Sequence, residues 1–114
     1  MRYRYFNGDR EIKFELDKND KYLLDKLAFI HLVVMKYEGL EKESLIYENE
    51  NIATITIVLS FSDWDDSSNA ESHCKRNLDS SGNIVKDYIG ALDAADPSRN
   101  MANQMLERAE STLE

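Results

Sequence analysis

The chain has 114 residues, a formal net charge of -8 and a single cysteine, with only one proline and four glycines. This length, together with a hydrophobic fraction of 42%, indicates one globular domain over residues 1–114 and excludes a disordered or fibrous chain. One cysteine excludes an internal disulfide, and the most apolar run, residues 27–35, is too short to span a bilayer. We therefore expect a cytoplasmic domain with no membrane span and no export signal.

The negative charge is unevenly distributed along the chain. Residues 1–36 contain eight Lys and Arg against six Asp and Glu, whereas residues 37–114 contain six against sixteen. An acidic surface repels the phosphates of nucleic acid, so direct binding to DNA or RNA is not expected. The same surface attracts a basic protein, or it simply keeps the chain in solution, and the sequence leaves both open.

The first segment predicts a β-hairpin. Asn7 and Gly8 both tolerate the backbone of a type I′ turn, and a two-residue loop pairs Arg4 with Glu11 as opposite charges. The alternation then places an apolar set on one face: Tyr3, Tyr5, Ile12, Phe14 and Leu16. The other face takes Arg2, Arg4, Glu11, Lys13 and Glu15.

A helix follows, capped by Asp17 or Asn19 and running to about Tyr37, where Gly39 ends it. Helical periodicity predicts one core stripe: Leu23, Leu24, Leu27, Ile30, Val34 and Met35. His31 falls inside this stripe. No second histidine or carboxylate lies four residues later, so we expect a core histidine and not a ligand.

The other side of this helix is also apolar, because it contains Phe29, Leu32 and Val33 among charged residues. Something must cover these three side chains. The C-terminal helices, a twofold-related copy and a client protein are the alternatives. Phe29, Leu32 and Val33 therefore form a predicted dimer or client face.

A second hairpin is predicted from residues 44–48 and 52–61. The returning strand alternates an inward apolar set of Ala53, Ile55, Ile57, Leu59 and Phe61 with an outward set of Thr54, Thr56 and Ser60. A three-residue loop over residues 49–51 pairs Leu45 with Ile55 and keeps both apolar sets on the core face.

The rest of the chain predicts helices. A short one covers residues 70–78, a second covers residues 83–94, and Asp96 with Pro97 begins the last. The fold class is therefore α+β, with a four-stranded antiparallel sheet made from two β-hairpins and helices packed on one face. The order is ββαββ, followed by two or three helices.

The most distinctive short string is Asp63, Trp64, Asp65 and Asp66. A calcium loop needs glycine at its sixth position and glutamate at its twelfth, but the chain has Ser68 and Cys74 there. One aromatic ring among carboxylates is instead typical of an anchor for a basic partner. The alternative is that Trp64 folds back on the sheet and the carboxylates form a solvated loop.

No sequence motif indicates an enzyme, a cofactor or a metal site. We therefore favour a small acidic protein that docks on a basic partner protein and blocks it, as immunity proteins, antitoxins and nucleic-acid mimics do. The first alternative is a small homodimeric secretion or assembly chaperone. The second is a ligand-binding domain or enzyme whose site is dispersed in the sequence, with Tyr88, His31 and His73 brought together by the fold.

Overall fold

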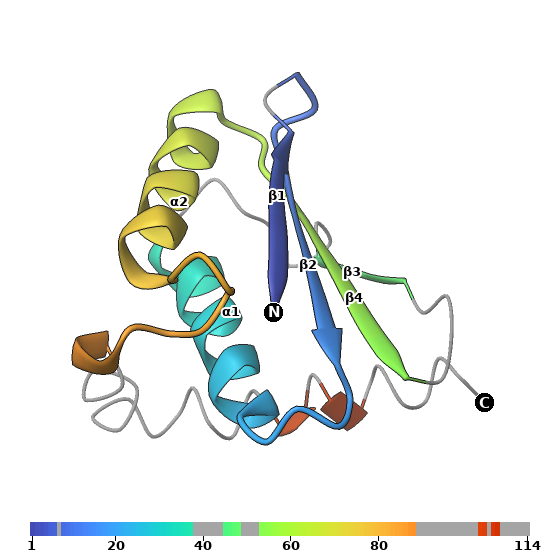
Figure 1. Cartoon of the computed structure of the whole chain (residues 1–114). Coiled ribbons are helices and arrows are strands. Elements are labelled where there is room, and N and C mark those ends of the chain that lie inside the picture. Colours follow the sequence, from blue (N-terminus) through green and yellow to red (C-terminus); the bar gives the residue numbers. More distant parts are fainter. Residues whose placement is uncertain (7, 38–44, 49–52, 89–102, 105, 108–114) are drawn as a thin grey trace.

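A computed structural model of the chain describes residues 1–6, 8–37, 45–48, 53–88, 103–104 and 106–107 (Figure 1). Its elements in chain order are β1 (Arg2–Phe6), β2 (Glu11–Asp17), α1 (Leu23–Lys36), β3 (Leu45–Glu48), β4 (Thr54–Ser60) and α2 (Trp64–Asn77). All strand pairs are antiparallel among the described residues. The predicted α+β class is confirmed.

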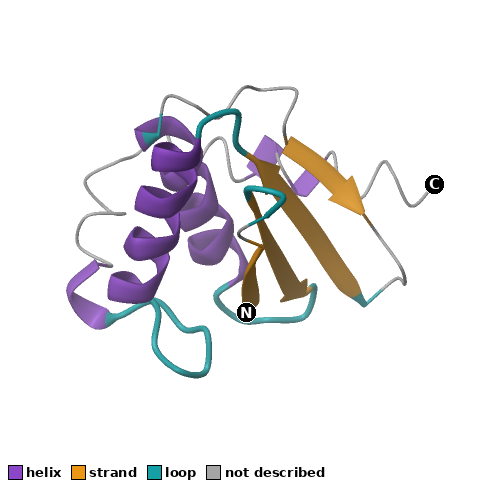
Figure 2. Ribbon diagram, turned by 90° about the horizontal axis from the view of Figure 1, so that it is seen from above, coloured by secondary structure: helices purple, strands orange, loops and turns teal. Residues whose placement is uncertain are grey.

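The sheet is built around β2 and β4, which pair with each other at its centre. β1 lies outside β2 and the short β3 lies outside β4, which gives the order β1-β2-β4-β3. Both α1 and α2 lie on the same side of the sheet (Figure 2). The core between these layers takes Ile12, Phe14, Leu16, Ile55, Ile57 and Leu59 from the sheet, Leu27, Phe29, Ile30 and Val33 from α1, and Ala70 and Cys74 from α2.

The register of the first hairpin differs from the predicted one. Arg4 lies opposite Lys13, not Glu11, because β1 ends at Phe6 and β2 begins only at Glu11. The strands are shifted by two residues, and Arg10 in the connection has a positive φ of 54°. A shift of two leaves every side chain on its predicted face, so hydrophobic patterning cannot distinguish the two registers.

The second strand pair shows the same kind of difference. Leu45 lies opposite Leu59, where a three-residue loop had placed it opposite Ile55. The inward apolar set of β4 is buried as predicted from Ile55 to Phe61. On its predicted outward face Thr56 and Val58 are buried as well, whereas Thr54 and Ser60 are partly exposed. The predicted loop at residues 49–51 lies outside the described residues.

Helix α1 begins later than predicted, at Leu23. The Asp17 carboxylate accepts the N–H of Asn19 at 2.8 Å, and the Asp20 carboxylate accepts the N–H of Tyr22 at 2.7 Å. These side chains therefore stabilise two turns before the helix, and the residue at its N-cap, Tyr22, makes no side-chain cap. Asx turns of this kind compete with helix formation.

The buried face of α1 is also different from the predicted stripe. Phe29 and Val33 are fully buried, whereas Leu24 and Met35 are 40% and 68% exposed. This helix has apolar residues of its own on all sides, so its hydrophobic periodicity does not indicate which side faces the core. Packing against both the sheet and α2 determines the buried side. His31 lies at the margin and is half-buried.

The chain after α2 forms a tight turn before a short helical stretch. Leu78 and Ile84 form an isolated antiparallel bridge, and the Asp79 carboxylate accepts the N–H groups of Ser81 and Asn83, each at 2.9 Å. Residues 86–88, 103–104 and 106–107 are helical. The rest of the predicted helices at residues 83–94 and after Asp96 lies outside the described residues.

Gly82 in this turn is required by its backbone and by its surroundings. Its φ is +79°, and a Cβ built on it would lie 1.3 Å from the carbonyl oxygen of Met1. A side chain here would therefore have both a strained backbone and a clash with backbone atoms that cannot rotate away. Gly8 has no neighbour within 4 Å of such a Cβ.

We predict that Gly82→Ala lowers the free energy of unfolding by about 2 kcal/mol or more, since left-handed backbone alone costs about 1–2 kcal/mol. Urea unfolding followed by circular dichroism measures the change. Gly8→Ala is the matched control and should stay within about 0.5 kcal/mol of the parent chain. Equal stabilities for the two variants would contradict this account of Gly82.

Candidate functional site

The predicted binding segment, residues 63–66, forms the start of α2. Asp63 is the N-cap residue, and its carboxylate accepts the N–H of Asp65 at 2.7 Å and that of Asp66 at 3.4 Å. Trp64 is the first helical residue, and it is 47% exposed. The segment lies at the same end of the molecule as the β1–β2 turn (Figure 1).

The β1–β2 turn contacts this end of α2 directly. Nη1 of Arg10 donates to the carbonyl oxygen of Ser62 at 2.6 Å, and the carbonyl of Arg10 accepts the N–H of Phe61 at 2.9 Å. Farther along, the Ser67 hydroxyl donates to the Tyr5 hydroxyl at 3.0 Å. The residues before and after Trp64 are thus tied to β1 and β2, and the indole projects from a fixed support.

The carboxylates of this segment have a structural function of their own. The N-terminus of a helix carries partial positive charge and unpaired N–H groups, which Asp63, Asp65 and Asp66 stabilise. Lys75 and Arg76 in the last turn complement the opposite end. Helix stability therefore explains the acidic residues, but it does not explain an exposed tryptophan among them.

The sequence predicted only the second half of α2, from residue 70. The segment before it has few apolar residues, and this suggested a loop. The missed signal is Asp63 as an N-cap, followed by small residues that α2 buries at helical spacing, namely Ser67, Ala70 and Cys74. Among the described residues, no group of three His, Cys, Asp or Glu side chains could hold a metal ion.

We predict that Asp63→Ala destabilises the chain by about 1 kcal/mol, because it removes an N-cap. Thermal unfolding followed by circular dichroism measures this change. Asp63→Asn keeps a side-chain oxygen for the cap and serves as the control, with a smaller loss. If both variants lose the same stability, the charge of Asp63 matters and its capping geometry does not.

A second group of interest is an aromatic cluster of Phe29, Tyr37, His73 and Tyr88. The His73 ring centroid lies 5.6 Å from that of Phe29, 5.8 Å from Tyr37 and 5.5 Å from Tyr88. Nε2 of His73 and the Tyr88 hydroxyl share a hydrogen bond of 3.0 Å. Nδ1 of His73 is buried without a hydrogen-bond partner among the described residues.

This environment favours the neutral imidazole. Burial lowers the pKa of His73 to about 4, and the positive charges of Lys36 and Arg76 act in the same direction. Burial also raises the pKa of the Cys74 thiol to about 12, with a further contribution from Glu71. His73 and Cys74 are therefore packed as core residues, although the predicted meeting of His73 with Tyr88 does occur.

We predict that the chain loses stability as the pH falls from about 6.5 to about 4. The unfolded state binds a proton with the ordinary pKa of histidine, 6.5, while folded His73 resists protonation until about 4. This difference corresponds to about 3 kcal/mol below pH 4. Urea unfolding at a series of pH values measures the slope.

His73→Phe should remove most of this pH dependence, whatever its effect on stability at neutral pH. His31 provides the control, because burial also lowers its pKa but it is only half-buried. His31→Gln should keep the main slope between pH 6.5 and 4. An unchanged slope in the His73 variant would show that other groups cause the acid sensitivity.

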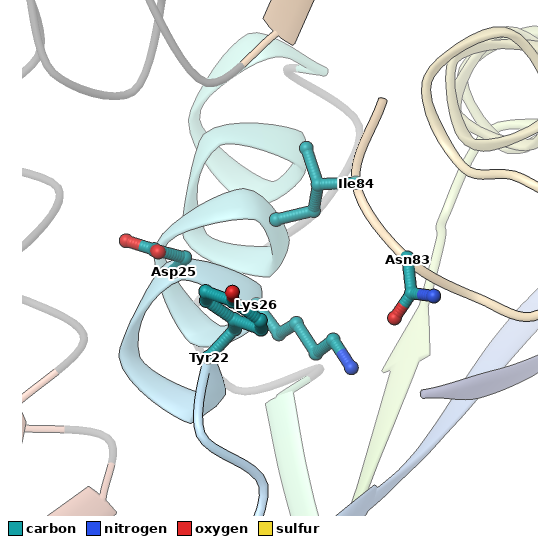
Figure 3. A pocket seen from close by; sticks show the side chains of 5 residues that line it. All are labelled: Tyr22, Asp25, Lys26, Asn83 and Ile84. Atoms are coloured by element: carbon teal, nitrogen blue, oxygen red, sulfur yellow. The ribbon is translucent and has the colours of Figure 1, made fainter. Parts of the chain in front are cut away.

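A pocket of about 320 Å³ lies between the start of α1 and the residues after α2 (Figure 3). Tyr22, Asp25, Lys26, Asn83 and Ile84 line it. Lys26 is only 3% exposed and forms an ion pair with Asp20. The pocket has room for a small molecule, but the ammonium group of Lys26 is already neutralised by Asp20.

The charge pair beside this pocket stabilises the fold. Burial alone would raise the pKa of Asp20, but the hydrogen bonds from Lys26 and from the N–H of Tyr22 outweigh it and hold that pKa below its usual value. Breaking such a pair leaves one charge buried without its partner. Lys26 therefore fixes the turn before α1 against the first helical turn.

The predicted dimer or client face of Phe29, Leu32 and Val33 is corrected by the structure. Phe29 and Val33 are fully buried within the chain, and Phe29 packs against His73 and Tyr88. Only Leu32 keeps exposed surface. The cover is intramolecular because α2 and the residues after it lie over this side of α1. Homodimerisation itself stays a prediction.

Comparison with protein-family models, with curated proteins and with solved structures finds no match to this chain. In the part of the chain that the structure describes, no helix has the length and apolar character needed to cross a bilayer. The case for a function therefore depends on the exposed side chains and their charges.

Proposed function

We propose that this chain is a small acidic binding domain that docks on a basic partner protein and blocks it, in the manner of an immunity protein, an antitoxin or a nucleic-acid mimic. The docking site is Trp64 with Asp63, Asp65 and Asp66. The observation that carries the proposal is the exposure of Trp64, which is 47% accessible in the first turn of a capped helix.

An exposed indole is a strong anchor for a partner. Burying its accessible half against another protein contributes about 1–2 kcal/mol, and tryptophan is enriched among the residues that dominate binding energies. Because Trp64 already has a fixed backbone, binding costs little ordering of the chain. This favours an anchor at α2 over the exposed Leu24 and Met35, which lie on α1 without a surrounding cluster of carboxylates.

The carboxylates around Trp64 give the site its preference for a basic partner. Asp65 is exposed and Asp66 is half-buried, so both charges reach solvent. Charges at the margin of an interface speed association and exclude partners of like charge more than they add affinity. The net charge of -8 acts in the same direction at longer range.

The chaperone alternative is less well supported than the docking proposal. It needs an exposed apolar seam, and two of the three residues predicted for that seam are buried. For the fold as a whole we further propose the finer arrangement of two β-hairpins in the order ββαββ, followed by two or three helices. The pairing of β3 with β4 supports it.

We predict that Trp64→Ala weakens binding to the partner at least tenfold while the chain stays folded. A tagged chain captures the partner from native lysate at low and high salt, and mass spectrometry identifies it. The purified partner is then titrated against the parent chain. Trp64 is the only tryptophan, so a blue shift of its emission reports its burial directly.

Tyr22→Ala is the matched control, because Tyr22 is an exposed aromatic residue at 53% but lies before α1. It should bind like the parent chain. Asp65→Lys should slow association and reduce its dependence on salt. If a stoichiometric partner binds without changing the emission of Trp64, the docking site lies elsewhere on the chain.

A further inference from the structure

β1 is an edge strand, and its backbone groups alternate between β2 and the outside. Lys18 donates its N–H to Ala53, and Arg10 accepts the N–H of Phe61, so even-numbered residues of β2 face β4. The odd-numbered residues of β2 therefore face β1. The register of the hairpin places the even-numbered residues of β1 opposite these odd-numbered residues, so their backbone groups bond to β2. The N–H and C=O groups of Tyr3 and Tyr5 therefore point away from β2, to the open edge of the sheet.

These outward groups have no hydrogen-bond partner among the described residues. They provide up to four main-chain hydrogen bonds along one line, which is the pattern that an added strand requires. On the face of β1 that meets the helices, the Tyr5 side chain is held by a hydrogen bond with Ser67 of α2. At the beginning of β1, the turn of residues 79–82 bounds a cavity of about 250 Å³ together with Met1, Arg2 and Tyr3.

The side chains on the other face of β1 select by charge. Arg2, Arg4 and Phe6 are all exposed and lie on alternate residues. Arg2 reaches Glu15 at 3.8 Å, and Arg4 lies opposite Lys13. On this face β1 itself carries two arginines and no carboxylate, and the carboxylates of Glu11 and Glu15 belong to β2, one strand farther from the edge.

We propose that β1 binds an extended acidic segment of a partner protein by β-augmentation. The added strand pairs with the backbone of Tyr3 and Tyr5, and its acidic side chains alternate along the face of Arg2 and Arg4. A second copy of this chain fits worse, because antiparallel pairing of two β1 strands places the arginines of both copies on one face. This site is separate from Trp64 and does not depend on the function proposed for it.

The test uses a fluorescein-labelled peptide that alternates Glu with Val, titrated with the full chain by fluorescence anisotropy. Saturable binding is expected, together with shifts of the Tyr3 and Tyr5 amide signals in NMR spectra. A peptide that alternates Lys with Val should not bind. Two versions of the acidic peptide, N-methylated on alternate amides in the two possible phases, should differ, because only one phase donates hydrogen bonds to β1.

Arg4→Glu should weaken binding of the acidic peptide about tenfold and should allow the Lys peptide to bind. This variant places opposite charges across the Arg4 and Lys13 pair, so an intact circular dichroism spectrum is expected. Trp64→Ala should bind the peptide normally, which separates the two sites. Equal binding of both N-methylated peptides would overturn the proposal. So would a dimer of the chain that becomes stronger in the Arg4→Glu variant.

Discussion

The apolar face of β2 and β4 packs against two helices at once, and the rest of the structure depends on this shared core. Helix α1 packs on the sheet, and α2 packs beside it on the same face (Figure 2). Phe29 occupies the junction, where its ring contacts His73 of α2 and Tyr88 after it. Because α1 has neighbours on two sides, Phe29 and Val33 are buried together with the residues that face the sheet, whereas Leu24 and Met35 stay exposed.

This arrangement separates the titratable groups of the core from those of the surface. His73 and Cys74 face the junction, where burial keeps both of them neutral near pH 7. The start of α2 projects beyond the junction and carries Trp64 with it. The residues that close the core thus fix the direction of α2, and this direction determines what the indole can contact.

Hydrophobic patterning predicted which face each β-strand residue takes, but not which residue it pairs with. Tyr3, Tyr5, Ile12, Phe14 and Leu16 share a face in both the predicted and the observed registers, since a shift of two residues preserves alternation. The choice between registers depends on the loop, where Arg10 adopts a left-handed backbone that its residue type does not indicate. Helix α2 was half missed because its first turns bury small residues, and small residues give a weak periodic signal.

For the candidate site, the sequence identified Trp64 and its carboxylates but could not decide whether the indole was exposed. The exposure of Trp64 is set by the position of α2, which begins at this residue after the Asp63 N-cap. The same limit applied to Phe29 and Val33, whose apolar character was evident while the element that covers them was not. In each case the residue type was informative, and the long-range packing that gave it a function was not encoded locally.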